Sequence, residues 1–216
     1  MFVKRRMSQP VITIPPKTPI AEALQLMQRE HIRRLPVVEN GRLVGIISDK
    51  DLLHASPSDA TSLSVWEVHY LVSQIRVKDV MTTEVITVKE DTPIEEAAYL
   101  MQGNKIGGLP VMNNGNVVGL ITETDLFKML LELMGAREAG VRVTAVIGDE
   151  RGRLAAVTKA IADAGGSVLA FGQFMGENSS NRILTFKVRR LDEDAVRQAL
   201  EPVVEELIDI RTTTAT

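Results

Sequence analysis

The first 130 or so residues of this chain contain one sequence pattern written twice. About half of the aligned positions carry identical residues, and the alignment needs no gap. The matched pairs, each 74 residues apart, include Met7 and Met81, Pro19 and Pro93, Pro36 and Pro110, Gly45 and Gly119, and Asp51 and Asp125. Two copies of a small α/β unit predict a pseudo-twofold pair with a cleft between them, and clefts of this kind are where ligands bind.

Composition narrows the class of protein. The 216 residues are 44% hydrophobic and 25% charged, which indicates a globular chain with a packed core. The net charge of −3 disfavours a general nucleic-acid binder, and the lack of cysteine excludes disulfides and thiolate chemistry. No apolar run is long enough to span a membrane, and we expect no secretory signal. We therefore expect a cytoplasmic protein that binds neither nucleic acid nor membrane.

Each copy is expected to fold as strand, helix, strand, strand and helix. Pro19 and Pro93 suit the start of a helix, and Asn40-Gly41 is a strong hairpin-turn signal that recurs in the second copy. The strands expected in the first copy are 11–14, 35–38 and 43–47, and those in the second are 85–88, 109–112 and 117–121. Residues 126–134 continue as an amphipathic helix that ends at Gly135.

The pattern changes between the copies and again after them. Residues 65–75, which include Trp66 and Tyr70, predict a linker helix. From residue 141 the order strand, helix, strand, strand, helix, strand is typical of a ferredoxin-like unit. The expected domains are a first repeat at 1–60, a linker helix at 61–76, a second repeat at 77–135 and a ferredoxin-like unit at 140–216.

The repeated segments resemble a known family. LPVV…NGRLVGIISDKDL and LPVM…NGNVVGLITETDL resemble CBS domains, and two in tandem are similar to a Bateman module. The segment DERGRLAAVTKAIADAGGSV resembles an ACT domain, and the combination is similar to the AcuB-type acetoin-utilisation proteins. The resemblance implies an α/β (α+β) fold, in which a tandem CBS-domain pair is followed by a ferredoxin-like βαββαβ ACT domain.

This resemblance implies regulation and not catalysis. CBS pairs usually bind AMP, ADP, ATP or S-adenosylmethionine in the cleft between the copies, and ACT domains usually bind small metabolites at dimer interfaces. The sequence carries no GxxxxGK[S/T], GxSxG or HExxH motif that would point to an enzyme. We expect a non-catalytic homodimer that senses an adenine nucleotide and acts on a regulated protein, without a required cofactor. A dimeric scaffold with vestigial clefts and an S-adenosylmethionine sensor are the alternatives.

One short motif begins the last helix of each copy. Ser48-x-x-Asp51 and Thr122-x-x-Asp125 match a helix capping box, in which the hydroxyl and the carboxylate bond the opposite backbone N–H groups. A helix N-terminus also offers free N–H groups to a phosphate. In the family pattern the aspartate holds the ribose and the hydroxyl residue assists on the phosphate side. The capping and ligand-binding interpretations are compatible.

The family pattern also implies an apolar slot for adenine in each copy. By position its residues are Ile12, Ile32 and Arg33 in the first copy, and Ile86, Ile106 and Gly107 in the second. The alternative for Ile12 and Ile86 is an ordinary core position.

The two copies differ just before their Leu-Pro pairs, where Arg33-Arg34 in the first corresponds to Gly107-Gly108 in the second. In the family geometry the phosphates point at the opposite copy, so the Asp125 site faces two guanidinium groups, which suit phosphate oxygens. A solvated pair of arginines is the alternative. The predicted main site comprises Arg33, Arg34, Ile86, Ile106, Gly107, Thr122 and Asp125, and the second site comprises Ile12, Ile32, Ser48 and Asp51.

Signals elsewhere are weaker. Asp149 and Gly152 occupy the strand-to-helix turn where ACT domains bind small ligands, and a plain tight turn is the alternative. Three scattered histidines and no cysteine predict that the chain has no metal site. The apolar helices expected at a dimer interface are 24–27, 97–101 and 126–134.

Overall fold

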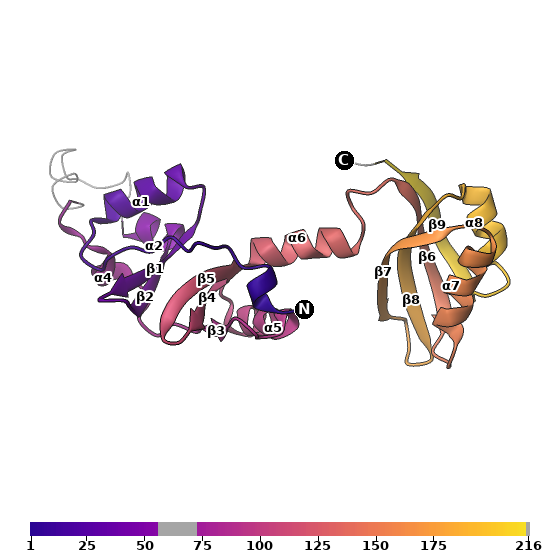
Figure 1. Ribbon diagram of the computed structural model, residues 1–216, viewed down its shortest axis with the longest axis horizontal. Helices are drawn as coiled ribbons and strands as arrows, with labels where there is room; N and C mark the ends of the chain where they lie inside the picture. Colours follow the sequence, from indigo (N-terminus) through magenta and orange to yellow (C-terminus); the bar gives the residue numbers. More distant parts are fainter. Residues whose placement is uncertain (56–72, 215–216) are drawn as a thin grey trace. The chain divides into compact units, whose positions relative to one another are not determined.

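The computed structural model describes residues 1–55 and 73–214 (Figure 1). It has a mixed α and β architecture, and it divides into two compact units, Met1–Leu126 and Phe127–Thr216. Most of the linker helix expected at 61–76, with Trp66 and Tyr70, lies outside the described residues. None of the helices in the described part of the chain is both long and apolar enough to span a membrane.

The first repeat forms a helix, a hairpin and a second helix. These elements are α1 (Ile20–Arg29), β1 (Arg34–Glu39), β2 (Arg42–Ser48) and α2 (Asp49–His54). The hairpin turns at Asn40-Gly41, where both residues have positive φ angles of 52° and 79°, as the turn signal predicts. The strand expected over 11–14 is wrong, because only Ile14 pairs with the hairpin. Pro15 and Pro16 follow it and have no N–H to continue the pairing.

The second repeat builds the same helix, hairpin and helix, preceded by a short strand where the first repeat has only the single bridge at Ile14. They are β3 (Val88–Lys89), α5 (Ile94–Asn104), β4 (Gly108–Asn113), β5 (Asn116–Thr122) and α6 (Glu123–Leu133). The β4–β5 hairpin is antiparallel and carries a register shift at Val111/Met112, which matches the shift at Val37/Val38 of the first hairpin. The internal repeat therefore persists down to local irregularities of strand pairing.

Each repeat is completed by a segment that precedes the other repeat in the chain. The 3-10 helix η1 (Val3–Arg5) packs on the second repeat, and the Val3 N–H donates to the Thr92 carbonyl at 2.9 Å. The helix α4 (Val77–Val80) packs on the first repeat, and the Val77 N–H donates to the Thr18 carbonyl at 2.9 Å. The two donors, Val3 and Val77, are 74 residues apart, and so are the two acceptors, Thr18 and Thr92. The exchange of segments therefore follows the symmetry of the repeat.

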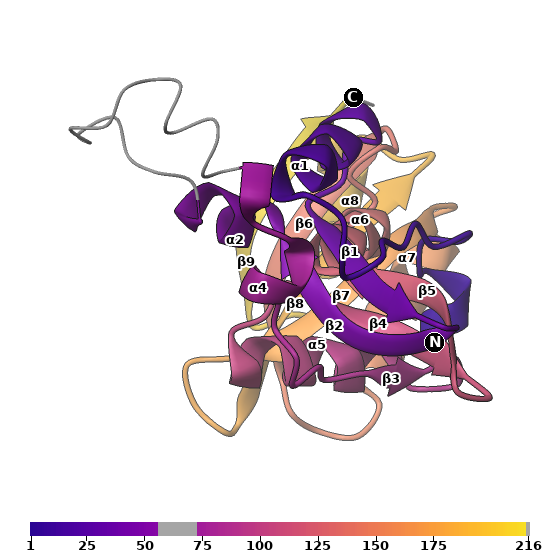
Figure 2. The same cartoon turned by 90° about the vertical axis from the view of Figure 1, so that its left-hand side faces the viewer.

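The two lobes defined by this exchange have separate cores. The first lobe combines α1, β1, β2 and α2 with residues 75–82, and the second combines β3, α5, β4, β5 and the start of α6 with residues 1–8 (Figure 2). The buried residues of the first core are Ile14, Ile20, Ala23, Met27, Leu35, Val37, Ile47, Leu52 and Val77. Those of the second core are Val3, Met7, Val88, Ala97, Met101, Leu109, Val111 and Ile121.

A glycine in each hairpin permits the exchanged segment to lie close. Thr82 pairs with Ile46 of β2, and a Cβ on the neighbouring Gly45 would meet the Met81 sulfur at 2.5 Å. At the matching position of the second lobe, a Cβ on Gly119 would collide with Met7. In both lobes a methionine side chain therefore occupies the space beside the glycine.

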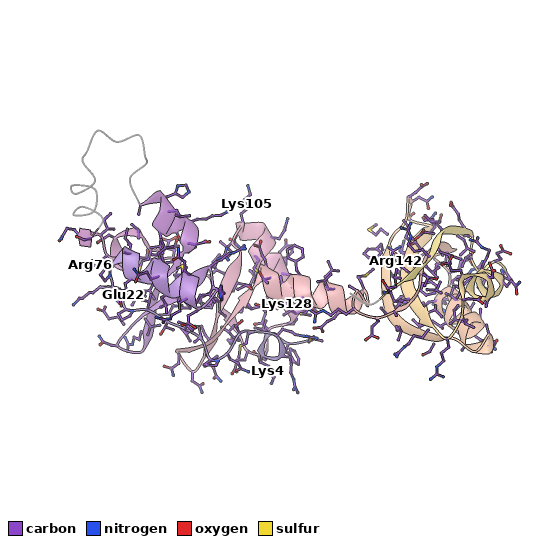
Figure 3. All side chains as sticks on the ribbon, turned by 90° about the horizontal axis from the view of Figure 1, so that it is seen from above. Lys4, Glu22, Arg76, Lys105, Lys128 and Arg142 are labelled. Atoms are coloured by element: carbon purple, nitrogen blue, oxygen red, sulfur yellow. The ribbon has the colours of Figure 1, made fainter. Side chains whose placement is uncertain are left out.

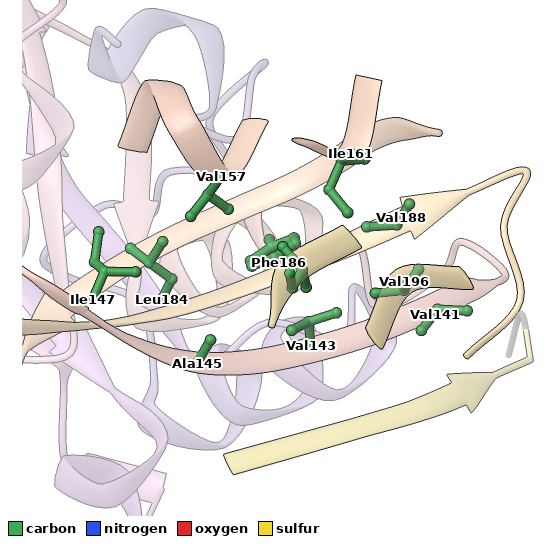
Figure 4. Close-up of a cluster of buried hydrophobic side chains, with 11 residues drawn as sticks. Val141, Val143, Ala145, Ile147, Val157, Ile161, Leu184, Phe186, Val188 and Val196 are labelled. Carbon is green, nitrogen blue, oxygen red and sulfur yellow. The ribbon is translucent and has the colours of Figure 1, made fainter. Parts of the chain in front are cut away.

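The second unit has the ferredoxin-like order expected from the sequence. Its elements are β6 (Gly140–Gly148), α7 (Arg153–Asp163), β7 (Ser167–Met175), β8 (Asn181–Arg189), α8 (Glu193–Leu200) and β9 (Glu206–Thr213). The strands form an antiparallel sheet in the order β7-β8-β6-β9. Val157 and Ile161 of α7 and Val196 of α8 pack against alternate residues of the two central strands (Figure 4).

The end of α6 is fixed inside the second unit. Gly135 follows the helix with a φ of 59°, as expected for a residue that ends a helix in the left-handed region. The Lys187 ammonium of β8 donates to the carbonyls of Gly135 and Glu138, both at 2.7 Å. Lys187 is only 4% exposed, so these two carbonyls supply the hydrogen bonds that a buried ammonium requires.

Candidate functional site

The two capping motifs have the same geometry. The Ser48 N–H and hydroxyl donate to Oδ2 of Asp51 at 2.8 and 2.7 Å, and the Asp51 N–H returns a bond to the Ser48 hydroxyl at 3.3 Å. The Thr122 N–H and hydroxyl donate to Oδ2 of Asp125 at 2.9 and 2.7 Å, with a return bond of 3.4 Å. The capping interpretation is confirmed, and each carboxylate is thereby held in a fixed orientation.

The two aspartates differ in burial. Asp125 is 8% exposed, whereas Asp51 is half-buried. A carboxylate that is fixed and largely removed from water makes stronger hydrogen bonds than a mobile one on the surface, since competition from solvent is reduced. Asp125 is therefore the less solvated of the two capping carboxylates.

A side chain of the first repeat crosses to the second repeat beside this cap. The position that a Cβ would take on Gly107 lies 2.8 Å from Cζ of Arg34, with the Arg34 Nη2 atom nearer still. A Cβ on Gly108 would lie 3.4 Å from Cδ of Arg34 and 3.4 Å from Cγ2 of Thr122. The arginine stem thus follows the Gly107-Gly108 backbone, and its guanidinium group occupies the space that the missing side chain of Gly107 leaves open.

The second repeat adds a carboxylate at the same place. Oε2 of Glu123 lies 2.7 Å from the Cβ position of Gly107, so it approaches the same point as the Arg34 guanidinium. Glu123 is not among the site residues predicted from the sequence. The available signal was its position between Thr122 and Asp125, directly after the strand that leads into the cap.

The first repeat has the same backbone here with different side chains. The Asp49 N–H donates to the Arg33 carbonyl at 3.0 Å, and the equivalent Glu123 N–H donates to the Gly107 carbonyl at 3.2 Å. Gly108 stands where Arg34 stands in the first repeat, so it sends no side chain back toward Arg33. The asymmetry between the two sides therefore arises from side chains on equivalent backbones.

The two arginines predicted to face the Asp125 site are placed differently. Arg34 is half-buried and lies against Gly107 and Gly108, whereas Arg33 is exposed. The atoms nearest to the Gly107 Cβ position come from Arg34 and Glu123. The geometry thus brings the Arg34 side chain to Gly107 and Gly108, while the side chain of Arg33 is exposed to solvent.

The predicted apolar slot residues lie at the margins of the two cores. Ile12 and Ile32 pack against the first core, and Ile86 and Ile106 pack against the second, all four half-buried. Ile106 follows Lys105, an exposed residue with a left-handed φ of 55° (Figure 3). All four side chains therefore contribute to a core and keep part of their apolar surface accessible.

The turn residues predicted as a ligand position in the second unit have structural partners. Asp149 forms an ion pair with Arg182 of β8, and its N–H donates to the Ser180 carbonyl at 2.8 Å. Gly152 precedes α7 with a φ of 87°, and a Cβ there would meet no atom within 4 Å. Its backbone conformation accounts for the glycine without a closely approaching group.

Two carboxyl groups of the second unit have lowered pKa values. The pKa of Asp209 lies below its usual range because Arg211 donates hydrogen bonds to it, with an added contribution from Arg142. The pKa of Glu193 is lowered because it accepts bonds from the hydroxyl and N–H of Thr212, at 2.6 and 2.7 Å. These groups belong to the pairing of β9 with its neighbours and not to the turn that contains Asp149.

Comparison with known proteins identifies the family of the first unit. The CBS domain family matches residues 3–58 and 77–132, which together make up more than half of the chain, so the chain belongs to the CBS domain family. A CBS domain-containing protein of Dictyostelium discoideum is 34% identical over 136 residues, which cover 62% of this chain and 94% of that protein.

Two relatives from Methanocaldococcus jannaschii are much longer than the shared region. The chain is 36% identical to an inosine-5′-monophosphate dehydrogenase over 130 residues, which cover 59% of this chain and 23% of the enzyme. It is 35% identical to the uncharacterised protein MJ1225 over 126 residues, and it spans 43% of that protein. These matches show shared CBS domains and do not carry over a catalytic activity.

Solved CBS pairs have a similar fold. The pair of protein MJ0100, in complex with 5′-methylthioadenosine and S-adenosylmethionine, is 30% identical with a TM-score of 0.51, covering 60% of this chain and 95% of that one. CBSX2 in complex with AMP is 28% identical with a TM-score of 0.52, covering 61% and 97%. A Vibrio cholerae protein assigned to acetoin utilisation (AcuB) is 32% identical with a TM-score of 0.52, covering 64% and 98%.

Proposed function

We propose that this chain is a non-catalytic regulatory protein that binds AMP, ADP or ATP at the Asp125 side of its CBS pair. The observation that carries the proposal is the crossing of the Arg34 side chain from the first repeat to Gly107 and Gly108 of the second. A buried carboxylate and a guanidinium from opposite repeats are the two groups that a nucleoside phosphate requires. The proposed site residues are Arg34, Ile86, Ile106, Gly107, Thr122 and Asp125, with the exposed Arg33 proposed at the margin of the site.

Each group in this site has a definite chemical task. The Asp125 carboxylate accepts hydrogen bonds from the ribose hydroxyls, and the Arg34 guanidinium donates to phosphate oxygens. The half-buried Ile86 and Ile106 offer apolar surface to the adenine ring. The complexes of CBSX2 with AMP and of MJ0100 with two adenosine compounds support an adenosine ligand.

The second site is built on Asp51, with Ser48, Ile12 and Ile32. Its cap geometry equals that of the Asp125 side, but Gly108 supplies no cation from the opposite repeat. We therefore assign it a lower affinity for phosphate-bearing ligands.

The second unit is proposed as an ACT domain that acts as a second sensor or as a dimerisation and output unit. Asp149 and Gly152 are its proposed ligand positions. The proposed homodimer uses apolar helix surfaces within 24–27, 97–101 and 126–134. Exposed apolar residues on α6 support this choice: Phe127, Leu130, Leu131 and Leu133. A regulated protein would read the nucleotide signal in the cytoplasm, and the AcuB likeness favours a link to acetoin utilisation.

An S-adenosylmethionine sensor is the second candidate. One observation favours it, because the Glu123 carboxylate beside Gly107 would attract the positive charge of that ligand. The bound S-adenosylmethionine of MJ0100 supports the same alternative.

Calorimetric titration of the full chain with AMP, ATP, S-adenosylmethionine and adenosine tests the proposal. Asp125→Ala should abolish binding of AMP at the main site. Asp51→Ala is the matched control, because it removes the equivalent cap and should leave the main site able to bind. Preference for S-adenosylmethionine over AMP would favour the second candidate. Lack of binding by all four compounds would leave the dimeric scaffold as the function of the pair.

A further inference from the structure

The guanidinium assigned to phosphate already has a negative neighbour. The Arg34 guanidinium and the Glu123 carboxylate approach the same point, the open Cβ position of Gly107. Glu123 is exposed and Arg34 is half-buried, so water screens the attraction between the two charges. A phosphate that binds Arg34 must share this cation with the carboxylate or displace it.

In the part of the chain that the structure describes, only the Asp125 side of the CBS pair has a carboxylate that can compete with phosphate for an arginine. Glu123 is the first residue of α6, directly after the hydroxyl residue of the Asp125 cap. Its counterpart Asp49 is the first residue of α2, and the Asp49 carboxylate accepts the Lys50 N–H at 2.9 Å. Asp49 faces no arginine from the second repeat, because Gly108 stands at the position of Arg34.

We propose that Glu123 is a specificity-determining residue that competes with the ligand phosphate for Arg34. This inference rests on the proposed nucleotide site. Glu123 lowers the affinity for adenosine carrying a phosphate while leaving the affinity for neutral adenosine unchanged. The nucleotide concentration needed to fill the site is therefore higher than it would be if Arg34 and Asp125 acted without Glu123.

The test is a double-mutant cycle read by calorimetric titration with AMP and adenosine. Glu123→Gln keeps the side-chain size and removes the charge, so AMP should bind about threefold to fivefold more tightly, as expected for an exposed charge pair. Adenosine affinity should stay the same. In the Arg34→Gln background, Glu123→Gln should bring no gain for AMP. Asp49→Asn is the matched control and should leave AMP binding unchanged.

The outcomes separate this inference from the proposed function. An AMP gain in Glu123→Gln that disappears in the Arg34→Gln background supports competition for Arg34. No gain, or an equal gain in both backgrounds, overturns the inference while the nucleotide site stands, provided the unmodified protein binds AMP. If that protein binds no AMP, the proposed function fails and the inference fails with it.

Discussion

The two repeats share one backbone and differ in a small number of side chains. Both have a capped last helix, the same register shift in the hairpin and a core completed by a segment that precedes the other repeat in the chain. They differ where Arg33-Arg34 faces Gly107-Gly108. The fold is symmetric because the core positions of the two repeats match, whereas the chemistry is asymmetric because positions 33–34 and 107–108 carry different side chains.

A second difference concerns the last helix of each repeat. The helix α2 has 6 residues and ends at His54, whereas α6 has 11 residues and continues into the second unit. The cap that orients Asp125 therefore lies at the start of α6. Gly135, which follows the end of α6, accepts a hydrogen bond from the Lys187 ammonium.

We expect the greatest loss of stability from substitutions in the two exchanged segments, and the loss should be similar for both. Val3 and Val77 are 74 residues apart and each is 0% exposed. An aspartate at either position would bury an unpaired carboxylate, so Val3→Asp and Val77→Asp should each lower the free energy of unfolding by at least about 3 kcal/mol. Urea denaturation followed by circular dichroism measures the change. A near-neutral result for one variant would show that its segment is not part of the opposite lobe's core.

Local signals in the sequence predicted most elements of the fold. The Asn-Gly turns, the helical spacing from Ile20 to Met27 and the glycines after the helices all act within a few residues, so pattern reading finds them. The ferredoxin-like order of the second unit follows for the same reason. The exchange of segments could not be predicted from the repeat pattern. The pattern assigns Met7 to the first copy, as the match of Met81, but the Met7 side chain packs in the core of the second lobe.

The candidate site was predicted only in part, for a physical reason. The capping boxes were found because their hydrogen bonds span three residues of sequence. The approach of Arg34 to Gly107 joins residues far apart in the chain, and a resemblance to a family suggested it where periodicity could not. Glu123 was missed because the position next to a capping hydroxyl carries no pattern of its own.

A smaller loss of stability is expected from removing the Lys187 hydrogen bonds at the end of α6, the helix that is longer in the second repeat than in the first. Lys187→Met keeps the length of the side chain but leaves the carbonyls of Gly135 and Glu138 without their donor. The cost should be about 1–3 kcal/mol in the stability of the second unit. Hydrogen–deuterium exchange should show faster exchange in β6 and β8 and unchanged exchange in residues 1–55. Lys159→Met, at an exposed ion pair, is the control expected to have little effect. Equal exchange in both variants would contradict the role assigned to Lys187.

The two adjacent arginines should differ in how much they contribute to AMP affinity. Arg34→Gln should weaken AMP binding about tenfold, since a charge-assisted hydrogen bond to phosphate contributes about 1.5–3 kcal/mol and glutamine retains only part of it. Arg33→Gln should change the affinity less than about twofold, because an exposed charge that is screened by water contributes little. Adenosine should bind all three proteins equally, because it carries no phosphate.

The reverse ranking, with a larger loss for Arg33→Gln, would place the phosphates away from Gly107. Equal losses of AMP and adenosine in Arg34→Gln would mean that the arginine supports the fold of the site and does not hold phosphate. Only a loss confined to AMP and to Arg34 fits an asymmetry produced by one side chain that crosses between symmetric lobes. This contrast also fixes the side of the pair on which Glu123 can act, because its influence requires the guanidinium it approaches.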